Sequence, residues 1–164
     1  GFMMAHHLSP EFYKAPDHNM VGFHIEEAVY APLYYGYGGK DSGATTRSPE
    51  GQRTMWARRL DKEVLDIAPD TVLVFLRAAP DVIARRMRES PHTHQVVKEG
   101  DIEHVLERFE EEFSLSLITR RFELDTTAAT VEDTLAEFVE RIEPYLTQAD
   151  RLRILTHQAL RKDG

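Results

Sequence analysis

The sequence of 164 residues contains no cysteine, which excludes disulfide bonds and thiolate metal sites. A reducing compartment is the default for such a chain, so we expect a cytoplasmic protein. No apolar run approaches the roughly 18–20 residues that a membrane-spanning helix needs, and no signal peptide is recognisable. We therefore expect no membrane partner.

Positive charge is also in short supply. The chain has 20 Lys+Arg against 28 Asp+Glu, a net charge of −8, so we expect no nucleic acid polymer as a partner. A small anionic ligand would need a local cluster of arginines. With 41% hydrophobic and 29% charged residues, the composition and length fit a single folded domain over residues 1–164.

Apolar runs alternate with helical patterns along the chain. Met20 to Ile25 and Thr71 to Leu76 are short apolar runs that predict buried strands, and Arg121 to Leu124 predicts a weaker one. This alternation predicts an α/β fold, a three-layer parallel sheet with flanking helices and right-handed crossovers. Helices are expected over about 2–7, 49–68, 80–89, 102–113, 130–142 and 147–160, from apolar spacing, proline and acidic residues.

Two other features have ordinary interpretations. The charge run from Glu107 to Glu112 lies in an amphipathic helix, and we expect it to form a solvated face. His92 and His94 could share an ion with Glu99 or Asp101. Because no further ligand stands at a firm spacing, we predict no metal site.

Three segments resemble the P-loop nucleoside and nucleotide kinases, of the deoxynucleoside kinase and thymidylate kinase group. Glu26 to Tyr30, followed by Tyr34, resembles the Glu-Arg-Ser-Val-Tyr stretch that ends their third strand. Leu76 to Asp81 resembles their fourth strand and the start of the helix that enters the lid, and Phe122 to Thr127 resembles their fifth strand. The match covers about residues 21–146 and leaves an extra C-terminal helix within 147–161.

The phosphate-binding loop of that group is missing. The sequence contains no Gly-x-x-x-x-Gly-Lys-[Ser/Thr], whose backbone amides hold nucleotide phosphates. The glycine-rich stretch from Gly36 to Ser42 is a near miss, because Asp41 follows the lysine and the stretch comes after the segment that resembles the third strand. We interpret it as a surface loop. The resemblance therefore implies the C-terminal portion of a kinase, from a truncated reading frame or a shortened chain.

The first segment supplies the candidate catalytic and substrate-binding residues. The resemblance implies that Glu26 accepts a proton from the attacking hydroxyl or holds magnesium-bound water. A solvated strand end or a helix cap is the alternative for this side chain. Glu27 stands where the family has an arginine, which reverses the local field in the substrate site. Tyr30 and Tyr34 could contact a base and a sugar hydroxyl, or form the edge of the core.

Three arginines are candidates for the lid. Arg86 matches a family arginine, and Arg85 and Arg88 lie beside it on the same expected helix. Lid arginines in that family close over phosphates. For Arg85 and Arg88, a solvated helix face is the alternative.

These residues lead to two hypotheses of function. In the first, the chain is the substrate-and-lid portion of a nucleoside or nucleotide kinase of the thymidylate type. A complete family member would use ATP and Mg²⁺ to phosphorylate a nucleoside or nucleotide, but we expect neither cofactor to bind tightly to this chain. In the second, the chain is a non-catalytic kinase-like interaction module. Under both hypotheses, an incomplete sheet exposes an unpaired edge, so we expect a homo-oligomer.

Overall fold

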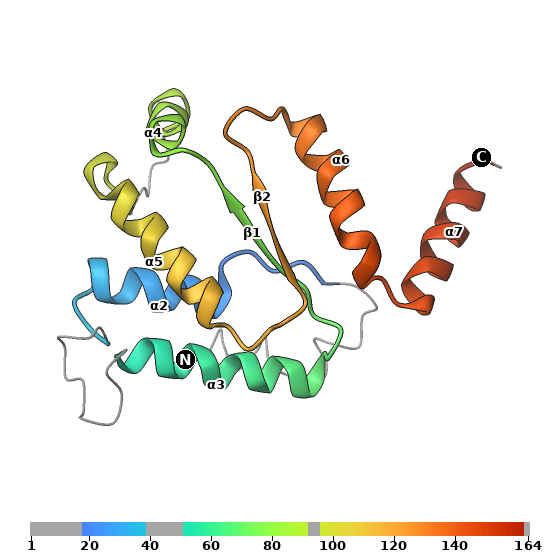
Figure 1. The fold of residues 1–164 in the computed structure, drawn as a ribbon, viewed down its shortest axis with the longest axis horizontal. Coiled ribbons are helices and arrows are strands. Elements are labelled where there is room, and N and C mark those ends of the chain that lie inside the picture. Colours follow the sequence, from blue (N-terminus) through green and yellow to red (C-terminus); the bar gives the residue numbers. More distant parts are fainter. Residues whose placement is uncertain (1–17, 39–50, 92–95, 163–164) are drawn as a thin grey trace.

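A computed structural model describes residues 18–38, 51–91 and 96–162 (Figure 1). The helices and strands follow in this order: α2 Phe23–Tyr34, α3 Gln52–Ile67, β1 Leu73–Arg77, α4 Pro80–Glu89, η2 Glu99–Asp101, α5 Ile102–Leu115, β2 Arg121–Asp125, α6 Val131–Ile142, η3 Glu143–Tyr145 and α7 Gln148–Lys162.

The two strands form a parallel pair between α5 and α6. Leu73 is in register with Arg121, and Arg77 with Asp125. Phe75 packs against Phe109 and Phe113 of α5, whereas Phe122 packs against Phe138 of α6. Because Phe75 is in register with Glu123 and not with Phe122, the two phenylalanines lie on opposite faces of the pair. Helices therefore cover both faces, as the parallel pairing requires.

The expected strand from Met20 to Ile25 is wrong. Backbone N–H of Phe23 donates to the Val21 carbonyl at 3.1 Å, and Gly22 has φ 79° and ψ −76°, the angles of a γ-turn. This turn starts α2 at Phe23, so Glu26 lies in the first turn of a helix and not at the end of a strand. Among the described residues the sheet has two strands, and the three-layer kinase-like sheet stays a prediction.

The other predicted elements agree closely with the structure. The helices expected over 80–89 and 130–142 correspond to α4 and α6, and those over 102–113 and 147–160 to α5 and α7. The helix expected over 49–68 corresponds to α3; of the apolar residues at helical spacing, Leu60 and Val64 are buried, whereas Trp56 and Ile67 are exposed. The helix expected over 2–7, and the part of the glycine-rich loop after Gly38, lie outside the described residues.

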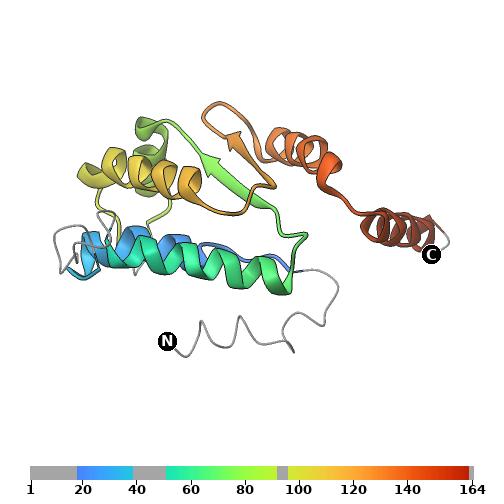
Figure 2. The ribbon, with the colours of Figure 1, turned by 60° about the horizontal axis from the view of Figure 1, so that its bottom comes forward.

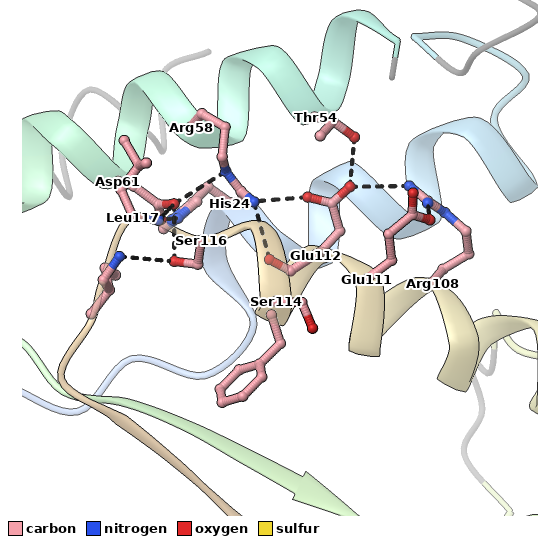
Figure 3. Close-up of polar contacts among 12 residues, drawn as sticks. His24, Thr54, Arg58, Asp61, Arg108, Glu111, Glu112, Ser114, Ser116 and Leu117 are labelled. Carbon is pink, nitrogen blue, oxygen red and sulfur yellow. Dashed lines mark hydrogen bonds and ion pairs between the residues drawn. The ribbon is translucent and has the colours of Figure 1, made fainter. Parts of the chain in front are cut away.

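A buried carboxylate joins the helices beneath the sheet (Figures 2 and 3). Asp61 of α3 is 0% exposed and receives a hydrogen bond from His24 Nε2 of α2 at 2.6 Å. Ser116 Oγ and the Leu117 N–H donate to its other oxygen, each at 2.9 Å. Burial by itself raises the pKa of the Asp61 carboxyl, but the hydrogen bonds from His24 and Leu117 and the charge of Arg58 outweigh it and lower the pKa. Asp61 is therefore ionised and tied to three segments of the chain.

A second buried carboxylate extends this network. Glu112 of α5 is 0% exposed, accepts a hydrogen bond from Thr54 at 2.5 Å and pairs with Arg108 at 3.0 Å. Arg58 lies between the two carboxylates, 3.2 Å from Asp61 and 3.3 Å from Glu112. The expectation that the charges from Glu107 to Glu112 are all solvated is thus wrong at its last residue, because Glu112 faces α3 and its arginine. Figure 3 shows the bridge from α3 to α5.

No helix in the part of the chain that the structure describes is long and apolar enough to cross a membrane.

We predict that Asp61→Ala lowers the free energy of unfolding by about 3–5 kcal/mol, because it leaves His24, Arg58 and a backbone N–H buried without their acceptor. Urea denaturation followed by circular dichroism measures the change. Asp66→Ala, at an exposed position of the same helix, serves as the control and should change stability by about 0.5 kcal/mol or less. Equal losses in the two variants would show that the network does not hold α2, α3 and α5 together.

Candidate functional site

Three of the predicted site residues form a row on α2. Glu26, Tyr30 and Tyr34 are four residues apart, so they share one face of the helix. Tyr34 donates a hydrogen bond to Asp101 at 3.2 Å, and the ring of Tyr30 meets Phe109 edge-on at 5.5 Å. The row therefore faces α5 and the short helix before it. Through its contact with Phe109, Tyr30 also packs at the edge of the core, which is the alternative given for this residue above.

The γ-turn before α2 sets the position of the Glu26 carboxylate. A Cβ atom at position 22 would collide with that carboxylate, so its side chain folds back over the backbone of Gly22. Glycine is favoured there because the positive φ would strain any other residue, whereas the flexible Glu26 side chain can move away from a Cβ. Phe23 follows with φ 52°, which is rare for a large side chain and indicates local strain.

Partial burial changes the acidity of all three residues in the row. Desolvation raises the pKa of the Glu26 carboxyl. It also raises the pKa of Tyr30, with smaller contributions from the charges of Glu26 and Tyr34. The pKa of Tyr34 rises through desolvation and then through its hydrogen bond to Asp101. A carboxylate with a raised pKa is a better proton acceptor, which suits the role expected of Glu26.

Glu27 contacts other residues than the row does. Its carboxylate lies 3.3 Å from Arg53 and accepts a hydrogen bond from the Tyr37 hydroxyl at 3.2 Å. The Arg53 guanidinium also lies over the Tyr37 ring, 4.6 Å from its centroid. Arg53 thus offsets the negative charge of Glu27. The structure separates Glu27 from the row of Glu26, Tyr30 and Tyr34.

The three lid arginines diverge from α4. Arg86 donates to the Thr126 hydroxyl at 2.9 Å and to the Thr126 carbonyl at 2.6 Å, at the carboxyl end of β2. Arg85 lies 4.0 Å from Glu89 in an exposed pair, as expected for a solvated face. Arg88 pairs with Glu99 of η2. They do not form one cluster, and only Arg86 reaches the strand ends.

The carboxyl ends of the two strands are joined by further hydrogen bonds. The N–H of Thr126 donates to the Arg77 carbonyl at 2.8 Å, and the N–H of Ala79 donates to the Thr127 hydroxyl at 2.8 Å. These bonds connect two of the segments that carry the kinase resemblance. In parallel sheets this edge is where ligands bind.

A groove of about 490 Å³ opens at this edge of the sheet. Its walls are mainly apolar and its rim holds an arginine and threonine hydroxyls. The volume lies within the range of about 300–1,000 Å³ that is typical of small-molecule sites. It is lined by Leu76, Arg86, Leu124, Thr126, Ala129, Thr130, Val131, Thr134, Leu135 and Phe138.

Two kinds of polar cluster would indicate chemistry among the described residues, a metal site and a catalytic triad. Within 18–38, 51–91 and 96–162, no three His, Asp or Glu side chains gather as a metal site would need. His92 and His94 lie outside these ranges. His24, Asp61 and Ser116 have the residue types of a catalytic triad, but Ser116 donates to Asp61 and not to the histidine. The histidine therefore cannot activate this serine, and the cluster is structural.

Neither the groove nor the buried carboxylates of Asp61 and Glu112 were predicted from the sequence. Helical spacing could have indicated that both carboxylates are buried. Asp61 lies between the buried Ala57 and Val64, and Glu112 lies seven residues after the buried Val105, so each shares a helix face with buried residues. Comparisons of the chain with family models, curated proteins and solved structures find no match.

We predict that Glu26→Gln raises the melting temperature at pH 7–8. A folded-state pKa above the unfolded value means that Glu26 favours folding only below its unfolded pKa of about 4.3, and this contribution is lost as pH rises through the folded pKa. Glutamine carries no charge, so the gain should disappear near pH 4. Differential scanning fluorimetry across pH measures it.

Glu27→Gln is the matched control for this prediction. It makes the same chemical change one residue along but removes a pair with Arg53, so it should give no gain at pH 7–8. A lower melting temperature for Glu26→Gln than for the unchanged chain at neutral pH would contradict the prediction.

Proposed function

We propose that the chain is the substrate-and-lid portion of a nucleoside or nucleotide kinase. The observation that carries this proposal is the parallel pairing of β1 and β2, which places the segments after Leu76 and Phe122 side by side. The lid arginine of the resemblance, Arg86, then donates to the second of these segments. Two motifs far apart in the sequence thus meet at the edge of a sheet where ligands bind.

The groove fits the base of a nucleoside. Leu76, Leu124 and Phe138 offer an apolar surface to a flat ring. The hydroxyls of Thr130 and Thr134 also line the groove, but both donate within the first turn of α6. Arg86 donates to neutral oxygens of Thr126, so its charge is not offset by these contacts. A planar guanidinium can stack on a base or bind an anionic group. We therefore expect a nucleoside or nucleoside monophosphate in the groove.

Glu26 is the proton acceptor that the resemblance implies, and its partly buried carboxylate with a raised pKa supports this role. It lies on α2, in a row that faces α5, whereas the groove lies between the strand ends and α6 on the opposite face of the pair. The groove and Glu26 therefore support the proposal separately. In a complete kinase ATP and Mg²⁺ would supply the transferred phosphoryl group. The sequence has no phosphate-binding loop, and the described residues do not gather ligands for the ion, so we derive no step through either.

A non-catalytic interaction module is the second candidate. Two observations favour it, the pairing of Glu27 with Arg53 and the exposed leucines of α7, which lies beyond the kinase resemblance. A module of this kind would bind a protein and leave the groove empty. Ligand binding therefore distinguishes the two candidates.

We predict that deoxynucleosides or their monophosphates stabilise the chain and that ATP–Mg²⁺ does not. Ligand binding at a hundredfold excess over the dissociation constant adds about 2.7 kcal/mol to stability, which a thermal-shift panel detects. Leu135→Gln should abolish the shift, because it puts a polar amide on the groove wall. Folding should tolerate the change, since Leu135 is 60% exposed.

Val139→Gln is the control, one turn further along α6 and outside the groove lining. It should keep the shift that the unchanged chain shows. No shift with any nucleoside or monophosphate would contradict the kinase proposal. An equal shift in Leu135→Gln would place the ligand outside the groove.

We also predict no ATP-dependent phosphoryl transfer by the purified 164 residues. Transfer needs a phosphate cradle that the sequence does not contain. The measurement follows radiolabelled γ-phosphate into deoxynucleosides, with Glu26→Gln as the background. Activity above that background would show that the chain handles ATP without the family's loop.

A further inference from the structure

Two neighbouring helices each expose an apolar stripe. On α6 the stripe consists of Val131, Leu135 and Val139, whose exposed fractions lie between 59% and 80%. On α7 it consists of Leu152 and Leu155, which are three residues apart and are 65% and 61% exposed. Single exposed leucines are ordinary, but contiguous stripes on adjacent helices indicate an interaction surface.

The charges beside the two stripes are opposite. The helix α6 carries exposed carboxylates of Glu132, Asp133 and Glu140. On α7, Arg151 and Arg153 pair with Glu143 and Asp150, and Arg161 adds a further positive charge. A basic helix stands out in a chain whose net charge is −8. The two surfaces are therefore complementary in charge as well as in apolar character.

The start of α7 is anchored in a way that holds it away from α6 of its own chain. Tyr145 stacks on Phe122 at 5.8 Å and donates to the Arg121 carbonyl at 2.9 Å, which fixes η3 against β2. Arg151 pairs with Glu143 and donates to its carbonyl at 2.8 Å, which fixes the first turn of α7 to η3. In both ribbon views α7 projects from the body (Figures 1 and 2). Both stripes remain exposed as a result.

We propose that two copies of this chain associate by exchanging these helices, with α7 of each copy lying on the α6 stripe of the other. A twofold arrangement forms this contact twice, which doubles the apolar area buried by a single helix pair. Pairing α7 with a second α7 would instead bring two basic helices together. The charges thus select α6 as the surface on which α7 docks.

This inference does not rest on the proposed function. The groove and the α6 stripe share Val131 and Leu135, so self-association is measured without nucleoside. Variants are placed at Val139 and on α7, outside the groove lining. A chain that binds no nucleoside can still dimerise in this way, and a monomer can still bind nucleoside.

The first test is sedimentation velocity over a concentration series. We expect a monomer–dimer equilibrium at tens of micromolar, and Leu152→Gln/Leu155→Gln should weaken the dimer at least about tenfold. Met55→Gln, an exposed apolar position on α3, should leave the equilibrium unchanged. A monomer at about 100 µM, or equal weakening by the control, would overturn the proposal.

Salt and cross-linking then identify the helices in contact. Salt screens the attraction between opposite charges, so raising sodium chloride from about 50 mM to about 500 mM should weaken the dimer. A dimer that paired α7 with α7 would instead become tighter, because salt would screen the repulsion between like charges. The sequence has no cysteine, so Val139→Cys and Leu155→Cys introduce unique thiols. A bis-maleimide should join the two variants to each other when they are mixed. Cross-linked dimers that join two copies of the same single-cysteine variant, with none joining Val139→Cys to Leu155→Cys, would overturn the exchange. A chain that carries both cysteines and forms cross-links only within itself would overturn it too.

Discussion

The ion pairs of Arg58 with Asp61 and Glu112 are the interaction on which the rest of the structure depends. Two carboxylates with no solvent exposure would be very costly to bury alone, and one guanidinium between them offsets part of that cost. Asp61 also accepts hydrogen bonds from α2 and from the segment after α5, and Glu112 accepts one from Thr54 of α3. These contacts fix α2, α5 and the segment after α5 relative to α3. The helix that carries Glu26 has its place because His24, two residues earlier, binds Asp61.

Elements with a long apolar period could be predicted from the sequence, and those set by a single turn could not. The helices α5 and α6 have several turns of apolar residues, so their signal is strong. Met20 to Ile25 is too short for periodicity to separate a strand from the start of a helix. The γ-turn at Gly22 decides the matter, and Ile25, Ala28 and Val29 then follow the spacing of a buried helix face. A turn of this kind has no reliable signature beyond the glycine itself.

The candidate site was predictable as residue types but not as an arrangement. The row of Glu26, Tyr30 and Tyr34 follows from a spacing of four once the helix is known, although the sequence was interpreted as a strand end. Helical geometry separates Arg86 from its neighbour Arg85, but it places Arg85 and Arg88, three residues apart, on one face. Their partners, Glu89, Thr126 and Glu99, depend on packing between distant segments and so could not be read from the sequence. The groove likewise depends on packing between distant segments, because the ends of β1 and β2 and one face of α6 line it.

The way in which the arginines are paired limits the ligand that the chain can take. Arg53 and Arg88 are held by carboxylates, and Arg77 lies within 4 Å of three more. Each such pair reduces the positive charge that could meet a triphosphate. Arg86 differs because its contacts are with neutral oxygens, and it stands at the rim of a mainly apolar groove. The guanidinium of Arg86 and the apolar wall of the groove suit a base with at most one phosphate, so within the proposed function they favour the acceptor side of the reaction over the donor side.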